Sequence, residues 1–213
     1  MKEYVLFDHD GVLVDTEPWY YRAGERALAD VGFTQDRGRY LRDMHHGQAT
    51  WAQARAAGID EATIDRQRAV RDRYYQEYLR TEAIEIDGVL DVLAALAPHV
   101  RMAIVTTSRR VDFDLIHEGG DILPFMDVVL VREDYVRAKP HPEPYLTALR
   151  ALGAAPEEAL VVEDSSRGLA AAVAAGIDCA VVHHDFTASH DFSAATHRIR
   201  TLAELPALVR DGA

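Results

Sequence analysis

The chain has 213 residues, of which 48% are hydrophobic and 27% are charged. These values are ordinary for a globular protein, and a chain of this length suits one domain, or one domain that carries a smaller insertion. The formal net charge of -12 at pH 7 argues against nucleic acids and anionic membrane surfaces as partners, because both would be repelled. Small soluble molecules are therefore the expected ligands.

Cys179 is the single cysteine of the sequence, and it lies in the apolar run 177–182. We therefore expect a buried thiol, with neither an intrachain disulfide nor a cysteine metal cluster. The sequence contains no apolar span of about 18 residues, so we expect no membrane helix, and its first strand begins too early for a signal peptide. Our expectation is a cytoplasmic protein that is a monomer or a weak dimer.

The first predicted element is a strand over residues 4–7, which is followed directly by Asp8, His9, Asp10 and Gly11. An apolar run bounded by a turn signal is typical of a buried central strand. The two aspartates would then lie at the carboxyl edge of a parallel sheet, where ligands bind in open α/β folds. The alternative is that they only cap a turn, as Asp before Gly commonly does.

The stretch from residue 16 to residue 85 shows helical patterns and no convincing strand. A first helix ends before Gly32, a second ends before Gly58, and a third, heavily charged helix covers residues 64–79, since glycine commonly ends a helix. This pattern predicts a helical insertion. We place the core of the protein at residues 1–15 and 87–213, and the insertion at residues 16–86.

Strand-like and helical patterns alternate in the rest of the chain. The predicted strands are 100–105, 128–131, 160–162 and 179–182, and the predicted helices are 89–96, 144–152, 169–175 and 202–209. This alternation predicts an α/β fold in which helices cover both faces of a parallel sheet.

Polar residues that would be unusual in a core follow three of these strands. They are Thr106, Thr107, Ser108, Arg109, Lys139, Glu163 and Asp164. Each cluster also has a purely structural interpretation, as a helix cap, a surface lysine or an acidic helix start. Because the carboxyl ends of parallel strands meet at one edge, the sequence favours a single site that includes Asp8 and Asp10. Hydroxyl, N–H and ammonium groups at such an edge are suited to binding phosphate.

The four carboxylates expected at this edge also predict a metal ion. Close carboxylates repel one another by several kcal/mol per pair at an effective dielectric constant near 20, and a hard divalent cation relieves that repulsion. Oxygen ligands without His or Cys suit Mg²⁺. We expect Asp8, the backbone carbonyl of Asp10 and Asp164 as ligands, with Glu163 either a ligand or one water further out.

The pattern Asp8-x-Asp10-Gly11-x-x-x-Asp15, together with Thr106, Lys139 and Glu163-Asp164, resembles the four ordered motifs of the haloacid dehalogenase superfamily of phosphohydrolases. The resemblance is to its branch of β-phosphoglucomutase-like proteins and small sugar-phosphate phosphatases. It implies a Rossmann-like core with a helical cap domain inserted after the first strand. It also implies that Asp8 is a nucleophile and Asp10 a general acid and base.

The resemblance implies a Mg²⁺-dependent phosphatase that hydrolyses small phosphomonoesters, in particular sugar phosphates, through an aspartyl phosphate. Phosphate would be bound by Gly11, Thr106, Thr107 and Lys139. A β-phosphoglucomutase-type mutase is the alternative, but Tyr20 stands where known mutases of the branch carry a histidine. A non-catalytic binding module is the alternative from another class, and it would predict loss of the catalytic aspartates or the lysine.

The sequence does not identify the substrate. Tyr20, His46, Gly47, Ser108 and Arg109 are the residues that we expect to select the substrate, although packing or solvent exposure would explain them equally well. His9 is unusual between the two aspartates. If strand geometry continues through it, its side chain points away from both of them and packs in the core.

Overall fold

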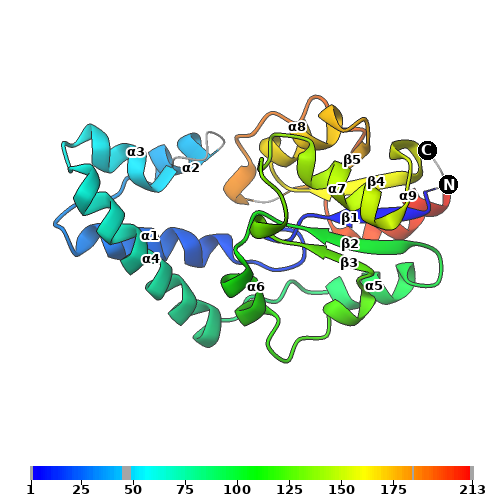
Figure 1. The fold of residues 1–213 in the computed structure, drawn as a ribbon, viewed down its shortest axis with the longest axis horizontal. Helices are drawn as coiled ribbons and strands as arrows, with labels where there is room; N and C mark the ends of the chain where they lie inside the picture. The colour runs from blue at the N-terminus through cyan, green and yellow to red at the C-terminus, as the bar shows by residue number, and fades with distance from the viewer. Residues whose placement is uncertain (1, 45–48, 184, 212–213) are drawn as a thin grey trace. The chain divides into compact units, whose positions relative to one another are not determined.

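The computed structural model describes residues 2–44, 49–183 and 185–211, and the chain forms two compact units (Figure 1). The first unit contains Met1–Asp15 and Glu85–Ala213, and the second contains Thr16–Ile84. The second unit covers most of the insertion that the sequence predicts at residues 16–86. Among the described residues, no helix combines the length and the apolar character that crossing a membrane requires.

A parallel sheet forms the centre of the first unit. Within the described residues it has six strands in the order β3-β2-β1-β4-β5-β6. The strands are β1 (Tyr4–Phe7), β2 (Arg101–Val105), β3 (Val128–Leu130), β4 (Ala159–Glu163), β5 (Asp178–Val182) and β6 (His197–Ile199), and neighbouring strands are parallel throughout. The predicted α/β fold class is confirmed.

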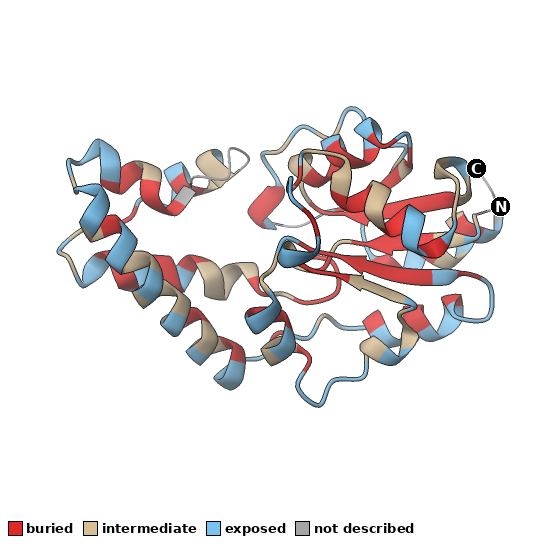
Figure 2. Ribbon diagram, viewed as in Figure 1, coloured by how far each residue is buried: buried red, intermediate tan, exposed pale blue. Residues whose placement is uncertain are grey.

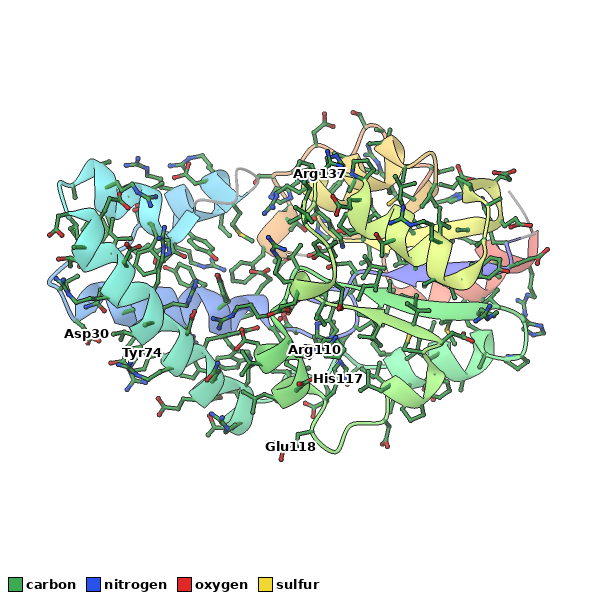
Figure 3. All side chains as sticks on the ribbon, viewed as in Figure 1. Asp30, Tyr74, Arg110, His117, Glu118 and Arg137 are labelled. Carbon is green, nitrogen blue, oxygen red and sulfur yellow. The ribbon has the colours of Figure 1, made fainter. Side chains whose placement is uncertain are left out.

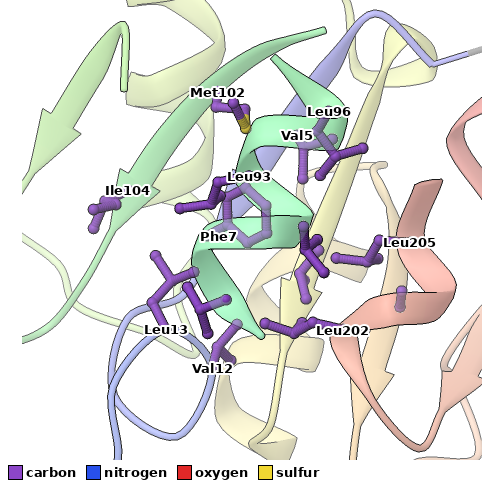
Figure 4. Close-up of a cluster of buried hydrophobic side chains, with 14 of the residues drawn as sticks. Val5, Phe7, Val12, Leu13, Leu93, Leu96, Met102, Ile104, Leu202 and Leu205 are labelled. Atoms are coloured by element: carbon purple, nitrogen blue, oxygen red, sulfur yellow. The ribbon is translucent and has the colours of Figure 1, made fainter. Parts of the chain in front are cut away.

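Helices cover both faces of the sheet, because successive side chains of a strand point to opposite faces. Val5 and Phe7 of β1 pack in one core cluster together with α5 (Val89–Leu96) and α9 (Leu205–Asp211), as Figure 4 shows. Leu6 packs in the other cluster, against α7 (Glu143–Leu152) and α8 (Ser166–Ala174). The strands between these layers are largely buried, as Figure 2 shows.

Strand register brings the ends of three strands to the same edge. Phe7 is aligned with Ile104 of β2 and with Val162 of β4, so the residues that follow them emerge together. The chain runs from β1 outward to β2 and β3, and then returns to the other side of β1 to form β4. Ligands bind in open α/β sheets at such a reversal of strand order.

The second unit is helical. Its helices are α1 (Glu17–Ala29), α2 (Arg37–Asp43), α3 (Ala49–Ala56) and α4 (Glu61–Thr81). Leu28, Trp51, Ala54 and Ile64 form its buried core. The hydroxyl of Tyr74 in α4 donates a hydrogen bond to Asp30 Oδ2 at 2.8 Å, which ties α4 to the end of α1 (Figure 3).

The structure also contains elements that the sequence pattern did not indicate. These are β6, α2, α6 (Arg110–Ile116) and short 3-10 helices at Leu123–Phe125, Arg132–Asp134, Pro156–Glu158 and Asp185–Thr187. The helix predicted at 202–209 is divided into a 3-10 helix at Leu202–Glu204 and α9. In β6 only Ile199 is buried. This short edge strand therefore lacks the apolar run by which the other strands were predicted. The helix predicted at 169–175 begins earlier, at Ser166, because Ser165 caps it and accepts a hydrogen bond from the backbone N–H of Gly168.

Two leucines of α5 provide a matched test of this packing. Leu93 is 1% exposed in the core cluster, whereas Leu90 of the same helix is 44% exposed. We expect Leu93→Ala to lower the free energy of unfolding by about 2–5 kcal/mol, because it removes buried methyl groups and leaves a cavity. Leu90→Ala should change it by about 0.5 kcal/mol or less. Urea denaturation of both variants checks this expectation, and equal losses would contradict it.

Candidate active site

A tight turn follows β1 and presents its two aspartates. The backbone N–H of Asp8 still bonds to the carbonyl of Val162 at 2.8 Å, so Asp8 continues the strand. The chain then turns, since the His9 carbonyl accepts from the N–H of Leu13 at 2.8 Å. Gly11 has a φ of 80°, and a Cβ there would overlap the Asp164 carboxylate. The glycine therefore lets the turn after β1 lie against the end of β4.

The ammonium of Lys139 lies at the centre of the site. Its Nζ is 2.5 Å from Asp8 Oδ1, 2.7 Å from Glu163 Oε1 and 2.8 Å from the carbonyl oxygen of Val105. The side chain is only 4% exposed. A lysine ammonium has three N–H donors, and three strand ends use all of them. The predicted residues Asp8, Lys139 and Glu163 are therefore in direct contact.

The carboxylate of Glu163 accepts hydrogen bonds at both oxygens. Oε1 accepts from Lys139 and from the Tyr145 hydroxyl at 2.8 Å. Oε2 accepts from the backbone N–H groups of Asp164 and Ser165 at 3.2 Å each, and from the Ser165 hydroxyl at 3.0 Å. The carboxylate also lies at the amino end of α8, where the helix dipole favours negative charge. This arrangement fixes Glu163 and, through it, Lys139.

Burial and neighbouring charges shift the protonation equilibria of the cluster. Burial and the charge of Glu163 raise the pKa of Asp8 to about 8, although Lys139 opposes the shift. Burial alone would lower the pKa of Lys139, but the charges of Asp8 and Glu163 outweigh it and raise that pKa above its ordinary value. One ammonium therefore stays charged between two carboxylates that it does not fully compensate.

Asp10 is held by two hydroxyl groups of the loop after β2. The hydroxyl of Ser108 donates to Asp10 Oδ2 at 2.7 Å, and that of Thr106 donates to the same oxygen at 3.2 Å. The Thr106 oxygen accepts from the backbone N–H of Ser108 at 2.9 Å. Thr106 is fully buried, and the Tyr135 hydroxyl donates to its carbonyl at 2.6 Å. The predicted residues Thr106 and Ser108 therefore both contact Asp10.

Three carboxylates at this edge could hold a metal ion. Asp8, Glu163 and Asp164 each offer an oxygen atom, and these atoms all lie within 4.8 Å of one another. The donor set consists of oxygen atoms alone, which suits a hard cation such as Mg²⁺. Burial, and after it the charge of Glu163, raise the pKa of Asp8 at this edge. The residues present therefore fit the predicted ion.

The remaining predicted residues have different surroundings. Thr107 is exposed in the loop after β2, and Arg109 donates from Nε and Nη2 to Asp112 Oδ2 at 2.9 and 2.8 Å. Tyr20 belongs to the second unit, where its ring packs edge-on against Tyr75 with centroids 5.2 Å apart. His46 and Gly47 lie outside the described residues.

The expected orientation of His9 is wrong in one respect. Its ring is fully buried as predicted, but its Nδ1 lies 3.4 Å from Asp10 Oδ2 instead of pointing away from both aspartates. The alternation of side chains holds only in a regular strand, and the turn after Asp8 ends it. The ring also contacts His117, which no sequence motif had indicated.

Gly168 offers a sensitive test of how tightly Glu163 is held. A Cβ at Gly168 would overlap the Glu163 carboxylate, whereas a Cβ at the helical Gly38 would come no closer than 3.4 Å to Asp36 Oδ1. Alanine is favoured over glycine inside a helix by about 1 kcal/mol. We expect Gly38→Ala to be neutral or stabilising, and Gly168→Ala to destabilise by about 1–3 kcal/mol through overpacking. Thermal unfolding of both variants measures this, and a stabilising Gly168→Ala would contradict it.

Comparison with known proteins places this site in a family. A sequence model of the haloacid dehalogenase-like hydrolases matches residues 5–182. Protein CbbY from Rhodobacter capsulatus is 31% identical, over 93% of this chain and 93% of that protein. Phosphorylated carbohydrates phosphatase from Thermotoga maritima is 31% identical, over 83% of this chain and 82% of that protein. The crystal structure of CbbY from Rhodobacter sphaeroides in complex with xylulose-(1,5)bisphosphate gives a TM-score of 0.82 at 27% identity and covers 96% of both chains.

The family match extends from β1 to β5 and therefore includes all four motifs of the site. The relatives match over most of their length as well as most of this chain. These findings confirm the resemblance drawn from the motifs and the predicted class of enzyme. The chain belongs to the haloacid dehalogenase-like hydrolase family.

Proposed function

We propose that the protein is a Mg²⁺-dependent phosphatase that hydrolyses small phosphomonoesters, in particular sugar phosphates, through an aspartyl phosphate on Asp8. The observation that carries this proposal is the contact of Asp8 with the buried ammonium of Lys139, at the same edge as Asp164 and Asp10. A nucleophilic carboxylate, a fixed cation and a second carboxylate are groups that phosphoryl transfer through an acyl phosphate can use.

Asp8 is the nucleophile in this proposal. Its side chain is 13% exposed, whereas that of Glu163 is fully buried, so a substrate can reach Asp8 but not Glu163. Attack by a carboxylate oxygen on phosphorus would break the bond to the leaving alcohol and form the acyl phosphate. Lys139 holds the carboxylate in place and opposes the upward shift of its pKa, and its charge stays next to the developing negative charge.

Asp10 acts as the general acid and then as the general base. Its carboxylate is oriented by the hydroxyl groups of Ser108 and Thr106, and its side chain is 18% exposed. As an acid it would protonate the leaving oxygen, and as a base it would deprotonate the water that hydrolyses the acyl phosphate. The two steps return both aspartates to their starting protonation states.

Mg²⁺ would be held by Asp8, Asp164 and the backbone carbonyl of Asp10. Both oxygens of Glu163 already accept hydrogen bonds, which favours a place for it one water further out. When bound, the ion neutralises charge on the transferring phosphoryl group. Gly11, Thr106, Thr107 and Lys139 are the proposed phosphate ligands from this chain. Binding would require the Gly11 N–H, the Thr106 hydroxyl and one N–H of Lys139 to exchange their present acceptors for phosphate oxygens.

The substrate class is inferred from relatives. The relative from Thermotoga maritima is named for phosphorylated carbohydrates, and the Rhodobacter sphaeroides structure contains a sugar bisphosphate. Tyr20, His46, Gly47, Ser108 and Arg109 remain the proposed selecting residues. Water is the proposed acceptor because Tyr20 replaces the histidine expected of a mutase.

The test is phosphate release from a panel of sugar phosphates, phosphoglycolate and nucleotides, with Mg²⁺ and with a chelator. We expect release that requires the ion, because the carboxylates otherwise leave the site with excess negative charge. β-Glucose 1-phosphate should yield glucose and phosphate, not glucose 6-phosphate.

The variants Asp8→Asn and Asp91→Asn form a matched pair, since Asp91 is exposed on α5. We expect Asp8→Asn to lower kcat by at least about a thousandfold and Asp91→Asn to retain activity. Full turnover by Asp8→Asn would exclude it as the nucleophile. Release that is insensitive to the chelator would exclude the metal, and isomerisation without release would identify a mutase.

A further inference from the structure

Two buried histidines form a hydrogen-bonded pair beside the acid and base of the proposed reaction. His9 Nε2 lies 2.9 Å from Nε2 of His117, which follows α6 (Figure 3). Both residues are buried, with His9 0% and His117 8% exposed. Phe113 completes a three-ring cluster, with its ring centroid 5.1 Å from that of His9 and 4.4 Å from that of His117. Packing therefore fixes the position of the His9 ring.

The hydrogen atoms of this pair can be assigned from the neighbouring groups. A neutral imidazole carries one N–H and one acceptor nitrogen, so only one of the two facing nitrogens donates. Burial and the neighbouring His9 lower the pKa of His117 to about 4, which keeps His117 neutral at physiological pH. The His9 Nδ1 faces Asp10 Oδ2 at 3.4 Å, and a lone pair there would face a carboxylate. His9 therefore carries a hydrogen on Nδ1, and with one hydrogen on each ring His117 donates to His9.

His9 is thus the third donor directed at one oxygen of Asp10. Ser108 and Thr106 donate to Oδ2 at 2.7 and 3.2 Å, and the longer contact from His9 approaches the same oxygen. Hydrogen bonds of catalytic groups are often long in the unliganded enzyme and shorten in the substrate complex. Three donors on one oxygen fix the rotation of the carboxylate about its Cβ–Cγ bond.

We propose that His117 is a positioning residue: through His9 it holds the Asp10 carboxylate in the orientation that proton transfer requires. The proposal rests on the proposed function, in which Asp10 is the acid and base. His117 sets the tautomer of His9, because its N–H occupies His9 Nε2 and leaves the His9 hydrogen on Nδ1. In functional sites, the hydrogen bond made by one nitrogen of a histidine ring commonly determines the tautomer and the orientation of that ring.

The first part of the test needs no substrate. Nitrogen-15 NMR of the histidine side chains distinguishes the protonated from the unprotonated ring nitrogen. We expect His9 to be protonated at Nδ1 and His117 at Nε2 in the full-length wild-type protein near neutral pH. His9 protonated at Nε2 and not at Nδ1 would overturn the proposal, because His9 would then present a lone pair to Asp10.

The second part compares three variants in steady-state kinetics. His117→Phe keeps an aromatic ring but removes the donor, and we expect kcat to fall about tenfold with KM unchanged, as for a hydrogen bond lost from the transition state. His117→Gln restores a side-chain N–H and should recover kcat to within about threefold of wild type. Phe113→Leu disturbs the same ring cluster without removing a donor, so it should lower thermal stability and lower kcat by less than His117→Phe does.

The kinetic outcomes separate positioning from packing. If His117→Phe and His117→Gln lose kcat equally, or if Phe113→Leu loses as much, the histidine pair acts only through packing and the proposal fails. Unchanged kcat in His117→Phe would also refute it. A wild-type protein that releases phosphate from no substrate would refute the proposed function, whereas a wrong His9 tautomer in an active enzyme would refute this inference alone.

Discussion

The buried ammonium of Lys139 is the interaction on which the rest of the site depends. It joins Asp8 after β1, Glu163 at the end of β4 and the carbonyl of Val105 at the end of β2. Without it, two carboxylates would lie in a buried environment with no opposite charge, which costs several kcal/mol. The partners of Lys139 lie at strand ends, so the register of the sheet sets their positions. The loop that carries Lys139 then places the ammonium between them.

The same contacts that hold the fold together at this edge also account for the chemistry we propose. Both carboxylate oxygens of Glu163 accept hydrogen bonds, and one of them accepts from Lys139. In our account the charge of Glu163 therefore orients the Lys139 ammonium, and its carboxylate does not contact the substrate. Asp8 is more accessible, and burial and the charge of Glu163 raise its pKa to about 8. A divalent cation and a phosphate ester at this edge would therefore meet a carboxylate whose position is already fixed.

The sequence predicts the sheet edge well because each strand there is an apolar run that ends in polar residues. Asp8 and Glu163 meet Lys139 as the order of the strands requires. The contact between His9 and His117 was not predicted, because the two residues are 108 positions apart and the turn after Asp8 breaks the strand alternation. The sequence also did not show that Ser108 bonds to Asp10, since a hydroxyl after a strand is equally typical of a helix cap.

The most direct measurement of the central claim is the stereochemical course of the reaction at phosphorus. A phosphorothioate ester that is isotopically chiral at phosphorus would be hydrolysed in isotopically labelled water, and the configuration of the released thiophosphate determined. Transfer to Asp8 and then to water consists of two in-line displacements, so the account predicts net retention of configuration. Net inversion would show direct attack by water and would contradict an intermediate on Asp8.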